Sequence, residues 1–399
     1  MEQNGRLVIT RQREQEKERV LSAFYEDGKA VELSCFDAGE EQLLGSIYIG
    51  KVKNIVKNIE AAFIEIEGGT LCYYSLRENE DPIYIKDKKG SKLSPGDELL
   101  VQVNKEAVKT KAPTVTCNLN FPGKYLVLTT GKKQLGLSSK LSLEERERLR
   151  KIAEPFLTGE FGVIVRTNGA QASEEVLREE FERLSRSCHK VLTAGRHQNC
   201  FSQVYREPPA YTAAIRNINK EQLLEIVTDD LGIYENLSRY LSEYQPEDQK
   251  KLRFYQEESP SLNHLYGIST AFKSALQERV WLKSGAYLII QPTEALTVID
   301  VNTGKYDGLK KLRETFLKIN LEAAGEIVRQ MRLRNLSGII VVDFIDMEEN
   351  EDREKLMEFL SHEVKKDPIK TVLVDMTPLG LVELTRKKVR RTLKEQVEE

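Results

Sequence analysis

The sequence lacks the features that mark membrane-spanning and secreted proteins. No stretch approaches the roughly 18 to 20 consecutive apolar residues that a membrane-spanning helix needs, and the N-terminal segment has no apolar signal-peptide core. The five cysteines are an odd number, widely spaced and without a CxxC pair, so neither a disulfide framework nor a zinc knuckle is indicated. We therefore expect a cytoplasmic protein that has no membrane span and keeps its thiols reduced.

An excess of positive charge is also lacking. The formal net charge is −3, which argues against a protein coated in positive charge for indiscriminate nucleic-acid binding. Any nucleic-acid site must therefore be local. The 399 residues, 40% of them hydrophobic, suffice for about two to four packed modules.

Short strands dominate the first part of the chain. Residues 5–35 contain short apolar runs that predict a strand pair with too few partners to stand alone, so a later segment must complete that sheet. Residues 45–76 and 98–116 carry short runs rich in β-branched and aromatic residues, which predicts a small barrel. In the second of these ranges, lysines alternate with apolar positions and could face a ligand.

A mixed α/β unit follows. Ser142 and Glu145 have capping-box spacing at the start of a charged helix. A strand at 161–167 precedes a second helix, for which Ser173 is the expected cap. The Gly, Pro and polar residues near residue 205 indicate a connection to the next unit.

The last part alternates strands with helices after a stretch, 219–290, whose pattern is largely helical. A long helix at 309–334 has an apolar stripe on one face, and another helix at 351–365 lies between two apolar strands. This order predicts an α/β sheet with at least partly parallel pairing. A basic run at 386–391 could contact phosphates, although such a run is more often solvated.

Two aspartates end apolar strands in this part. Asp300 and Asn302 are two residues apart on one strand, so their side chains share a side, and Asp343 ends a second strand. Ligands gather at strand ends in α/β sheets, and two carboxylates with an amide oxygen suit Mg²⁺, which can activate water and neutralise a phosphate. The alternative is that these aspartates only cap turns. Asp346 would face away from Asp343 if the strand continued.

Three segments resemble the bacterial ribonuclease E/G family: EALTVIDVNTG, NLEAAGEIVRQMRLRNLSGIIVVDFIDM and PLGLVELTRKK. The resemblance implies a ribonuclease G-like, Mg²⁺-dependent endoribonuclease that cuts single-stranded, AU-rich RNA in rRNA maturation and mRNA turnover. The downstream product would keep a 5′-monophosphate. In that family the motif aspartates and asparagine hold the metal, which implies metal ligands Asp300, Asp343 and Asn302 here, with Asp300 and Asp343 catalytic.

The resemblance also implies a multidomain α/β architecture. An RNase H-like subdomain would be assembled from residues 1–35 and 206–275, with an S-one type OB-fold barrel for RNA binding inserted at 36–117. A 5′-sensor α/β unit would occupy 118–205, and a DNase I-like α/β catalytic subdomain would occupy 276–399.

In the barrel, four residues match the family's RNA-contacting positions: Phe63, Tyr73, Lys105 and Lys111. Such a barrel grips single strands with aromatic platforms and a positive groove. The alternative is that Phe63 belongs to the core and that the lysines are ordinary surface residues. Tyr73 stands where the family usually has Phe, a change that keeps a stacking face.

In the unit at 118–205, the resemblance implies a site for a 5′-terminal monophosphate formed by Gly123, Val127, Arg166 and Thr167. Charge-assisted bonds from the Arg and Thr would be left unmade by an RNA with a 5′-hydroxyl, so monophosphorylated ends would be favoured. The family often has an arginine pair where this chain has Ser and Lys at 139–140, which bears on the strength of end sensing.

Family members usually continue into a CPxC zinc-link and a small dimerisation domain, whereas this sequence stops at Glu399. We therefore expect no zinc-linked tetramer and leave a homodimer open. The main alternative function is a noncatalytic RNA-binding protein whose α/β part serves as a scaffold. A second alternative is a metal-dependent phosphodiesterase for small nucleotides, which would need neither a barrel nor an end sensor.

Overall fold

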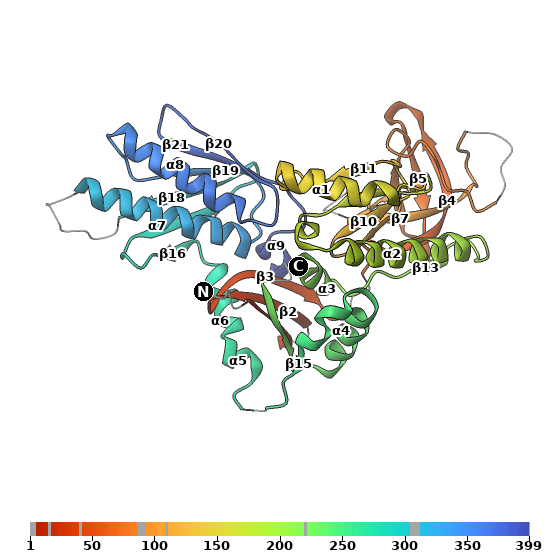
Figure 1. The fold of residues 1–399 in the computed structure, drawn as a ribbon, viewed down its shortest axis with the longest axis horizontal. Coiled ribbons are helices and arrows are strands. Elements are labelled where there is room, and N and C mark those ends of the chain that lie inside the picture. Colours follow the sequence, from red (N-terminus) through yellow and green to blue (C-terminus); the bar gives the residue numbers. More distant parts are fainter. Residues whose placement is uncertain are drawn as a thin grey trace. The chain divides into compact units, whose positions relative to one another are not determined.

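The structure is a computed structural model, shown as a ribbon in Figure 1. The residues it describes are 5–14, 17–39, 42–86, 92–107, 111–218, 222–257, 259–303 and 312–398. They divide into two compact units. The first unit comprises Met1–Gly39, Lys220–Glu235 and Lys250–Glu399, and the second comprises Glu40–Asn219 and Asn236–Gln249. Within the described ranges, every helix is too short or too polar to cross a bilayer.

The first unit contains a five-stranded sheet in the order β15-β14-β1-β2-β3. Three strands from the N-terminal region, β1 (Gly5–Glu14), β2 (Lys17–Glu26) and β3 (Lys29–Asp37), form an antiparallel meander. β14 (Leu223–Thr228) lies parallel to β1, and β15 (Leu252–Phe254) lies parallel to β14. A segment far along the chain therefore completes the N-terminal sheet.

The prediction that 219–290 is largely helical is wrong for β14 and β15. Ile226 and Val227 are fully buried in the sheet because β1 provides a hydrogen-bonding partner on one side of β14 and β15 on the other. Four helices lie in and beside this region. They are α3 (Thr212–Asn217), α4 (Leu231–Tyr244), α5 (Leu262–Tyr266) and α6 (Ile268–Ala275).

The second unit contains a closed five-stranded barrel, consistent with an OB-fold. Its strands follow the order β4-β5-β6-β8-β7, and β7 pairs back with β4 to close the barrel. They are β4 (Ile47–Val56), β5 (Ala61–Glu65), β6 (Leu71–Ser75), β7 (Glu98–Lys105) and β8 (Thr114–Thr116). The predicted barrel is thus confirmed, and β13 (Gln203–Tyr205) extends its sheet beyond β4.

A four-stranded sheet in the order β11-β12-β10-β9 follows the barrel in the same unit. Its strands are β9 (Asn120–Pro122), β10 (Leu126–Thr129), β11 (Leu135–Leu137) and β12 (Gly162–Val165). Apolar side chains of this sheet share one core with barrel residues such as Ile47 and Leu100.

Two helices accompany this sheet, and both of their predicted caps are confirmed. α1 (Leu143–Ala153) begins with a complete capping box between Ser142 and Glu145. The side chain of Ser173 caps α2 (Glu174–Gly195). These bonds satisfy backbone N–H groups that have no partner within the helix.

A six-stranded sheet forms the C-terminal part of the first unit, in the order β16-β17-β18-β19-β21-β20. Its strands are β16 (Arg279–Trp281), β17 (Tyr287–Pro292), β18 (Leu296–Asn302), β19 (Gly338–Asp343), β20 (Thr371–Met376) and β21 (Leu381–Arg386). β18 and β19 run parallel, and the other neighbouring strands are antiparallel.

Two helices, α7 (Leu312–Leu333) and α8 (Asn350–Lys365), cover one face of this sheet. Residues 309–311 of the predicted long helix lie outside the described residues. Val298 and Ile339 point to the opposite face and are 37% and 50% exposed, so the described residues leave that face uncovered.

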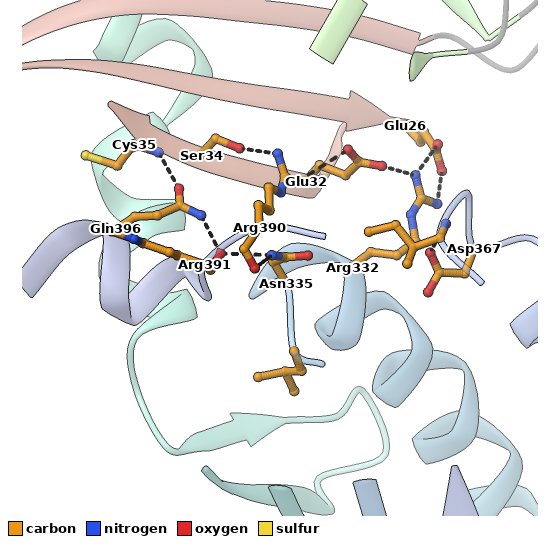
Figure 2. A network of polar contacts seen from close by, with 12 residues as sticks. Glu26, Glu32, Ser34, Cys35, Arg332, Asn335, Asp367, Arg390, Arg391 and Gln396 are labelled. Carbon is orange, nitrogen blue, oxygen red and sulfur yellow. Dashed lines mark hydrogen bonds and ion pairs between the residues drawn. The ribbon is translucent and has the colours of Figure 1, made fainter. Parts of the chain in front are cut away.

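The basic run near the C-terminus belongs partly to the core of the first unit. Arg386 is buried, and its guanidinium donates to Asp367 Oδ2 at 2.6 Å and to Asn335 Oδ1 at 3.0 Å. Arg390 donates to Ser34 Oγ at 2.8 Å (Figure 2). Arg386 is therefore not available to a phosphate, and Arg390, which is partly exposed, holds the chain against β3.

Further bonds connect this region to the N-terminal sheet (Figure 2). Arg332 of α7 donates to Glu26 at 3.0 Å and to Glu32 at 3.1 Å. The side chain of Gln396 in α9 (Leu393–Glu398) accepts a hydrogen bond from the backbone N–H of Cys35. Polar contacts therefore tie β2 and β3 to α7, and β3 also to α9.

Candidate active site and nucleic-acid interface

Asp300 and Asp343 are direct neighbours on the uncovered face of the six-stranded sheet. In the parallel pair of β18 and β19, Asp300 lies opposite Asp343. Paired residues share a face, and neighbouring strands are only about 4.8 Å apart. Asn302 lies two residues further along β18, and its Nδ2 donates to Asp300 Oδ2 at 2.6 Å. The fold thus brings the three predicted metal ligands together.

Three carboxylates, those of Asp300, Asp343 and Asp346, make the surroundings of the candidate metal site negative. The pKa of Asp343 is raised by partial burial, and further by the charges of Asp300 and Asp346. Among the described residues, no lysine or arginine forms an ion pair with any of these three aspartates. The site therefore has an unbalanced negative charge that a cation would compensate.

Asp346 lies outside the strand. β19 ends at Asp343, so the alternation that would turn Asp346 away does not continue to it. Asp346 is exposed, and its charge contributes to the raised pKa of Asp343. The condition under which Asp346 would face away is therefore not met, and Asp346 belongs to the electrostatic surroundings of the site.

The donor set fits a hard divalent cation. Asp300 and Asp343 offer carboxylate oxygens and Asn302 offers an amide oxygen, the ligand types that Mg²⁺ prefers. No group of three or more His, Cys, Asp or Glu residues suited to a metal occurs in the described part of the chain. A site with few protein ligands suits Mg²⁺, which usually keeps several of its waters.

Three of the four barrel residues predicted to contact RNA lie in one row. Phe63 pairs with Tyr73, and Tyr73 with Thr114 of β8. Thr114 in turn lies opposite Lys105. The ring centroids of Phe63 and Tyr73 are 6.3 Å apart in an edge-to-face arrangement. Lys111 is exposed but lies before β8, outside this row.

We call Phe63, Tyr73 and Lys105 the barrel row. This row lies on the outside of the barrel. Phe63 and Tyr73 are half-buried, whereas their neighbours Ile64 and Tyr74 point inward and are fully buried. Lys105 is exposed. The outer surface of the barrel therefore presents two aromatic rings beside a cation, and Phe63 is not an interior core residue.

Arg166 and Gly123, two of the four residues predicted to bind a 5′-phosphate, are in contact. Arg166 Nη1 donates to the Gly123 carbonyl at 2.6 Å, and Nη2 donates to Asn217 Oδ1 at 2.5 Å. Burial and the neighbouring Arg216 lower the pKa of Arg166 to about 10. The guanidinium is therefore fixed in direction and lies close to a second positive charge.

The other two predicted residues are close to Arg166 in chain position and strand register. Thr167 is exposed, and its hydroxyl is 2.8 Å from Ser138 Oγ. Val127 is on β10, where it pairs with Ile164 of the strand that leads to Arg166. Within the described part of the chain, no hydrogen bond connects Val127 to Arg166.

The family model of the Ribonuclease E/G family matches residues 120–389, which is more than half of the chain. This chain belongs to the ribonuclease E/G family. Ribonuclease G of Haemophilus influenzae (strain ATCC 51907 / DSM 11121 / KW20 / Rd) is 35% identical over 382 residues, covering 93% of this chain and 78% of the relative. Ribonuclease G of Escherichia coli (strain K12) is 32% identical with the same coverage.

Ribonuclease E of Synechocystis sp. (strain ATCC 27184 / PCC 6803 / Kazusa) is 34% identical over 389 residues, covering 95% of this chain and 57% of the relative. The resemblance to the ribonuclease E/G family that the sequence motifs indicate is therefore confirmed, and it extends over nearly the whole chain.

In this ribonuclease E/G family member, Glu180 supports the arginine site, and sequence reasoning missed it. Its buried carboxylate accepts hydrogen bonds from the backbone N–H groups of Lys124, Tyr125 and Leu126, at 2.7 to 2.8 Å. Burial raises the pKa of Glu180, although these three bonds oppose the shift. A Cβ on Gly123 would lie 2.6 Å from the Glu180 carboxyl carbon, so the turn requires glycine here.

One signal in the sequence could have identified Glu180. It lies three residues after Leu177 and four before Leu184, on the apolar stripe of α2, where a charged residue must find buried partners. Asn217 gave no such signal, because its bond to Arg166 joins residues that are distant in sequence.

Proposed function

We propose that this chain is a Mg²⁺-dependent endoribonuclease that cuts single-stranded, AU-rich RNA and leaves a 5′-monophosphate on the downstream product. Membership in the ribonuclease E/G family makes it an endoribonuclease. The observation that carries the magnesium proposal is the pairing of Asp300 with Asp343 on an uncovered sheet face, beside Asn302.

Asp300, Asp343 and the amide oxygen of Asn302 would hold the ion. A bound Mg²⁺ supplies a water of lowered pKa and neutralises charge that develops on a phosphate. The hydrogen bond from Asn302 orients the carboxylate of Asp300. Asp343, whose pKa is raised, must lose its proton before it can take part in binding.

The barrel row would hold the substrate. Phe63 and Tyr73 offer stacking faces that only unpaired bases can reach, which favours single strands over duplexes. Lys105 and Lys111 are exposed and would neutralise phosphates of the same strand.

The 5′ end of the RNA would bind at Gly123, Val127, Arg166 and Thr167. The pKa of Arg166 is lowered to about 10 by burial and by Arg216, so an incoming phosphate would compensate a positive charge that is costly to keep. The exposed hydroxyl of Thr167 can donate to the same phosphate. An RNA with a 5′-hydroxyl would leave these bonds unmade.

The subdomain assignments are part of this proposal. Residues 1–35 and 206–275 would form an RNase H-like subdomain, which the pairing of β1 with β14 supports. Residues 36–117 would be the RNA-binding barrel, 118–205 the 5′ sensor and 276–399 the DNase I-like catalytic part. The proposed setting is the cytoplasm, in rRNA maturation and mRNA turnover.

The decisive experiment compares cleavage of a short AU-rich RNA bearing a 5′-monophosphate, with Mg²⁺ and after chelation, by the natural chain and by Asp343→Asn. We expect internal cuts only with the metal, and a loss of at least about a hundredfold in the variant with RNA binding retained, because the metal supplies several kcal/mol of transition-state stabilisation. Asp375→Asn is the matched control, because Asp375 is exposed on β20 of the same sheet. Binding without cleavage by the natural chain would instead support the noncatalytic RNA-binding alternative.

A further inference from the structure

An exposed aromatic and cationic cluster lies at the β16 edge of the six-stranded sheet. Trp281, the only tryptophan in the chain, is 63% exposed. Its ring centroid lies 5.2 Å from that of Tyr287. The guanidinium carbon of Arg279 lies 5.7 Å from the Trp281 centroid and 4.7 Å from the Tyr287 centroid. We call Arg279, Trp281 and Tyr287 the edge cluster.

Strand register places the edge cluster on the same face as the candidate metal site. Trp281 lies opposite Tyr287, and Tyr287 lies opposite Asn302. In the neighbouring row, Arg279 lies two strands away from Asp300, or about 10 Å. A polymer that crosses this face to reach the carboxylates therefore passes within one or two strand widths of the cluster.

The cross-strand contacts of the edge cluster contribute modestly to the stability of the sheet, but they do not require the Trp281 ring to be exposed. A large exposed ring leaves apolar area in water that burial would otherwise remove. Within the described ranges, no carboxylate forms an ion pair with Arg279, whose guanidinium lies over the two rings. An aromatic face combined with an unneutralised cation is the combination that binds bases and phosphates of a single-stranded nucleic acid.

We propose that the edge cluster is a stacking site for a base of single-stranded RNA next to the cleaved bond, with Arg279 contacting the adjoining phosphate. This inference rests on the proposed function of the same sheet face. It adds a second group of RNA contacts, separate from the barrel row, that positions the strand over Asp300 and Asp343.

A protein partner is the competing occupant, since Trp, Tyr and Arg are also common in protein interfaces. A protein seated on the edge cluster would extend over the neighbouring strand that carries Asn302 and Asp300. It would then cover the carboxylates that a substrate has to reach. Continuity with the candidate metal site therefore favours RNA.

The single tryptophan permits a direct test that needs no cleavage. Short single-stranded RNA is added to the natural chain in chelator, and the emission of Trp281 is recorded. We expect saturable quenching, weaker binding for Arg279→Gln, and little quenching by a fully paired duplex of the same composition. No change in emission at RNA concentrations that saturate binding would overturn the proposal.

Kinetics with Mg²⁺ provide the second readout. Removing a stacking partner weakens RNA binding by roughly five- to hundredfold, so Trp281→Ser should raise KM by that factor with little change in kcat. Trp281→Phe, which keeps a stacking face, should restore most of the loss. Val372→Ser is the matched control, because Val372 is 42% exposed on the opposite edge strand β20, in the row of Ile339 and therefore four residues along the sheet from the row of Asp343.

The outcomes separate this inference from the proposed function. Quenching by RNA without any Mg²⁺-dependent cleavage would support the edge cluster and contradict the catalytic proposal. Normal cleavage with an unchanged KM in Trp281→Ser would overturn the edge cluster alone. A change of oligomeric state in sedimentation, with an unchanged KM, would assign the cluster to a protein contact and also overturn it.

Discussion

Two groups of charged residues in the first unit are arranged in opposite ways. Arg386 and Asp367 are both buried and satisfy each other, with Asn335 completing the set. Asp300 and Asp343 lie side by side with like charge, and no described cation pairs with them. Charges that complete each other stabilise the chain, whereas charges that leave an imbalance are suited to an external ligand.

The largest expected effect comes from removing one charge of the unbalanced pair. Asp300→Asn should lower the cleavage rate at saturating Mg²⁺ by about a thousandfold or more, because a metal ion supplies several kcal/mol of transition-state stabilisation. Thermal unfolding of the metal-free variant should occur no lower than in the natural chain, because the substitution removes repulsion. A variant that unfolds at clearly lower temperature would show that Asp300 has a structural partner after all.

The paired group should behave in the opposite way. Asp367→Asn leaves the buried guanidinium of Arg386 without its counter-charge, which should lower the free energy of unfolding by about 3 kcal/mol. Denaturant titration measures this loss, and cleavage per folded molecule should stay unchanged. Lys387→Gln, at an exposed neighbour of Arg386, is the control and should change stability by less than about 0.5 kcal/mol. A stable Asp367→Asn would remove the distinction between the two groups.

Arg166 lies between these extremes, since neutral oxygens of Gly123 and Asn217 hold it and no described carboxylate forms an ion pair with it. Arg166→Lys cannot keep both bonds, so the preference for 5′-monophosphate over 5′-hydroxyl RNA should fall by roughly tenfold. The ratio of kcat/KM for the two RNAs measures this preference. Arg178→Lys, at an exposed arginine of α2, should leave the ratio unchanged. An equal drop in both variants would argue against a specific end site.

The smallest effect concerns the pH dependence of metal binding. Because the pKa of Asp343 is raised, a proton competes with Mg²⁺ at higher pH than at an ordinary aspartate. The rise in Tm on adding Mg²⁺ should be complete above that pKa and should disappear as the pH falls through it.

The metal-free protein gives the complementary sign. The folded chain binds this proton more tightly than the unfolded chain does, so the contribution to stability is present at low pH and is lost as the pH rises through the raised pKa. Asp343→Asn should therefore raise the metal-free Tm at neutral pH, by at most about two degrees, and leave it unchanged in acid. A lower Tm at neutral pH would contradict the like-charge interpretation.

Local patterns gave the correct result where local bonds decide the structure. The caps at Ser142 and Ser173 and the apolar stripe of α7 depend on residues a few positions apart. The two caps and the stripe are all present in the structure. The pattern of residues 219–290 predicts helix for β14, because only its pairing with β1 decides that it is a strand. Sequence periodicity contains no information about a partner that is distant along the chain.

At the candidate site too, local patterns predict the elements, whereas contacts between distant segments cannot be predicted. Placing Asp300 and Asp343 at strand ends followed from their apolar runs, but their exact opposition is a matter of register between two strands. For the arginines at 386 and 390 the sequence leaves phosphate contact and solvation both open, since their partners Asp367 and Ser34 cannot be recognised from spacing. The edge cluster escaped notice because Trp281 and Tyr287 are brought together only by the turn between β16 and β17.

The sheet of β1 to β3 has a consequence for biosynthesis. Its parallel partner β14 begins about 200 residues after β1 ends, and at about 5–20 residues per second a ribosome needs roughly 10 to 40 s to make that stretch. The barrel strands, in contrast, all lie between Ile47 and Thr116 and can pair as soon as they emerge. During translation the first strands therefore wait with an open edge while later segments fold, and a chaperone that shields this edge would have its period of action set by the distance to β14.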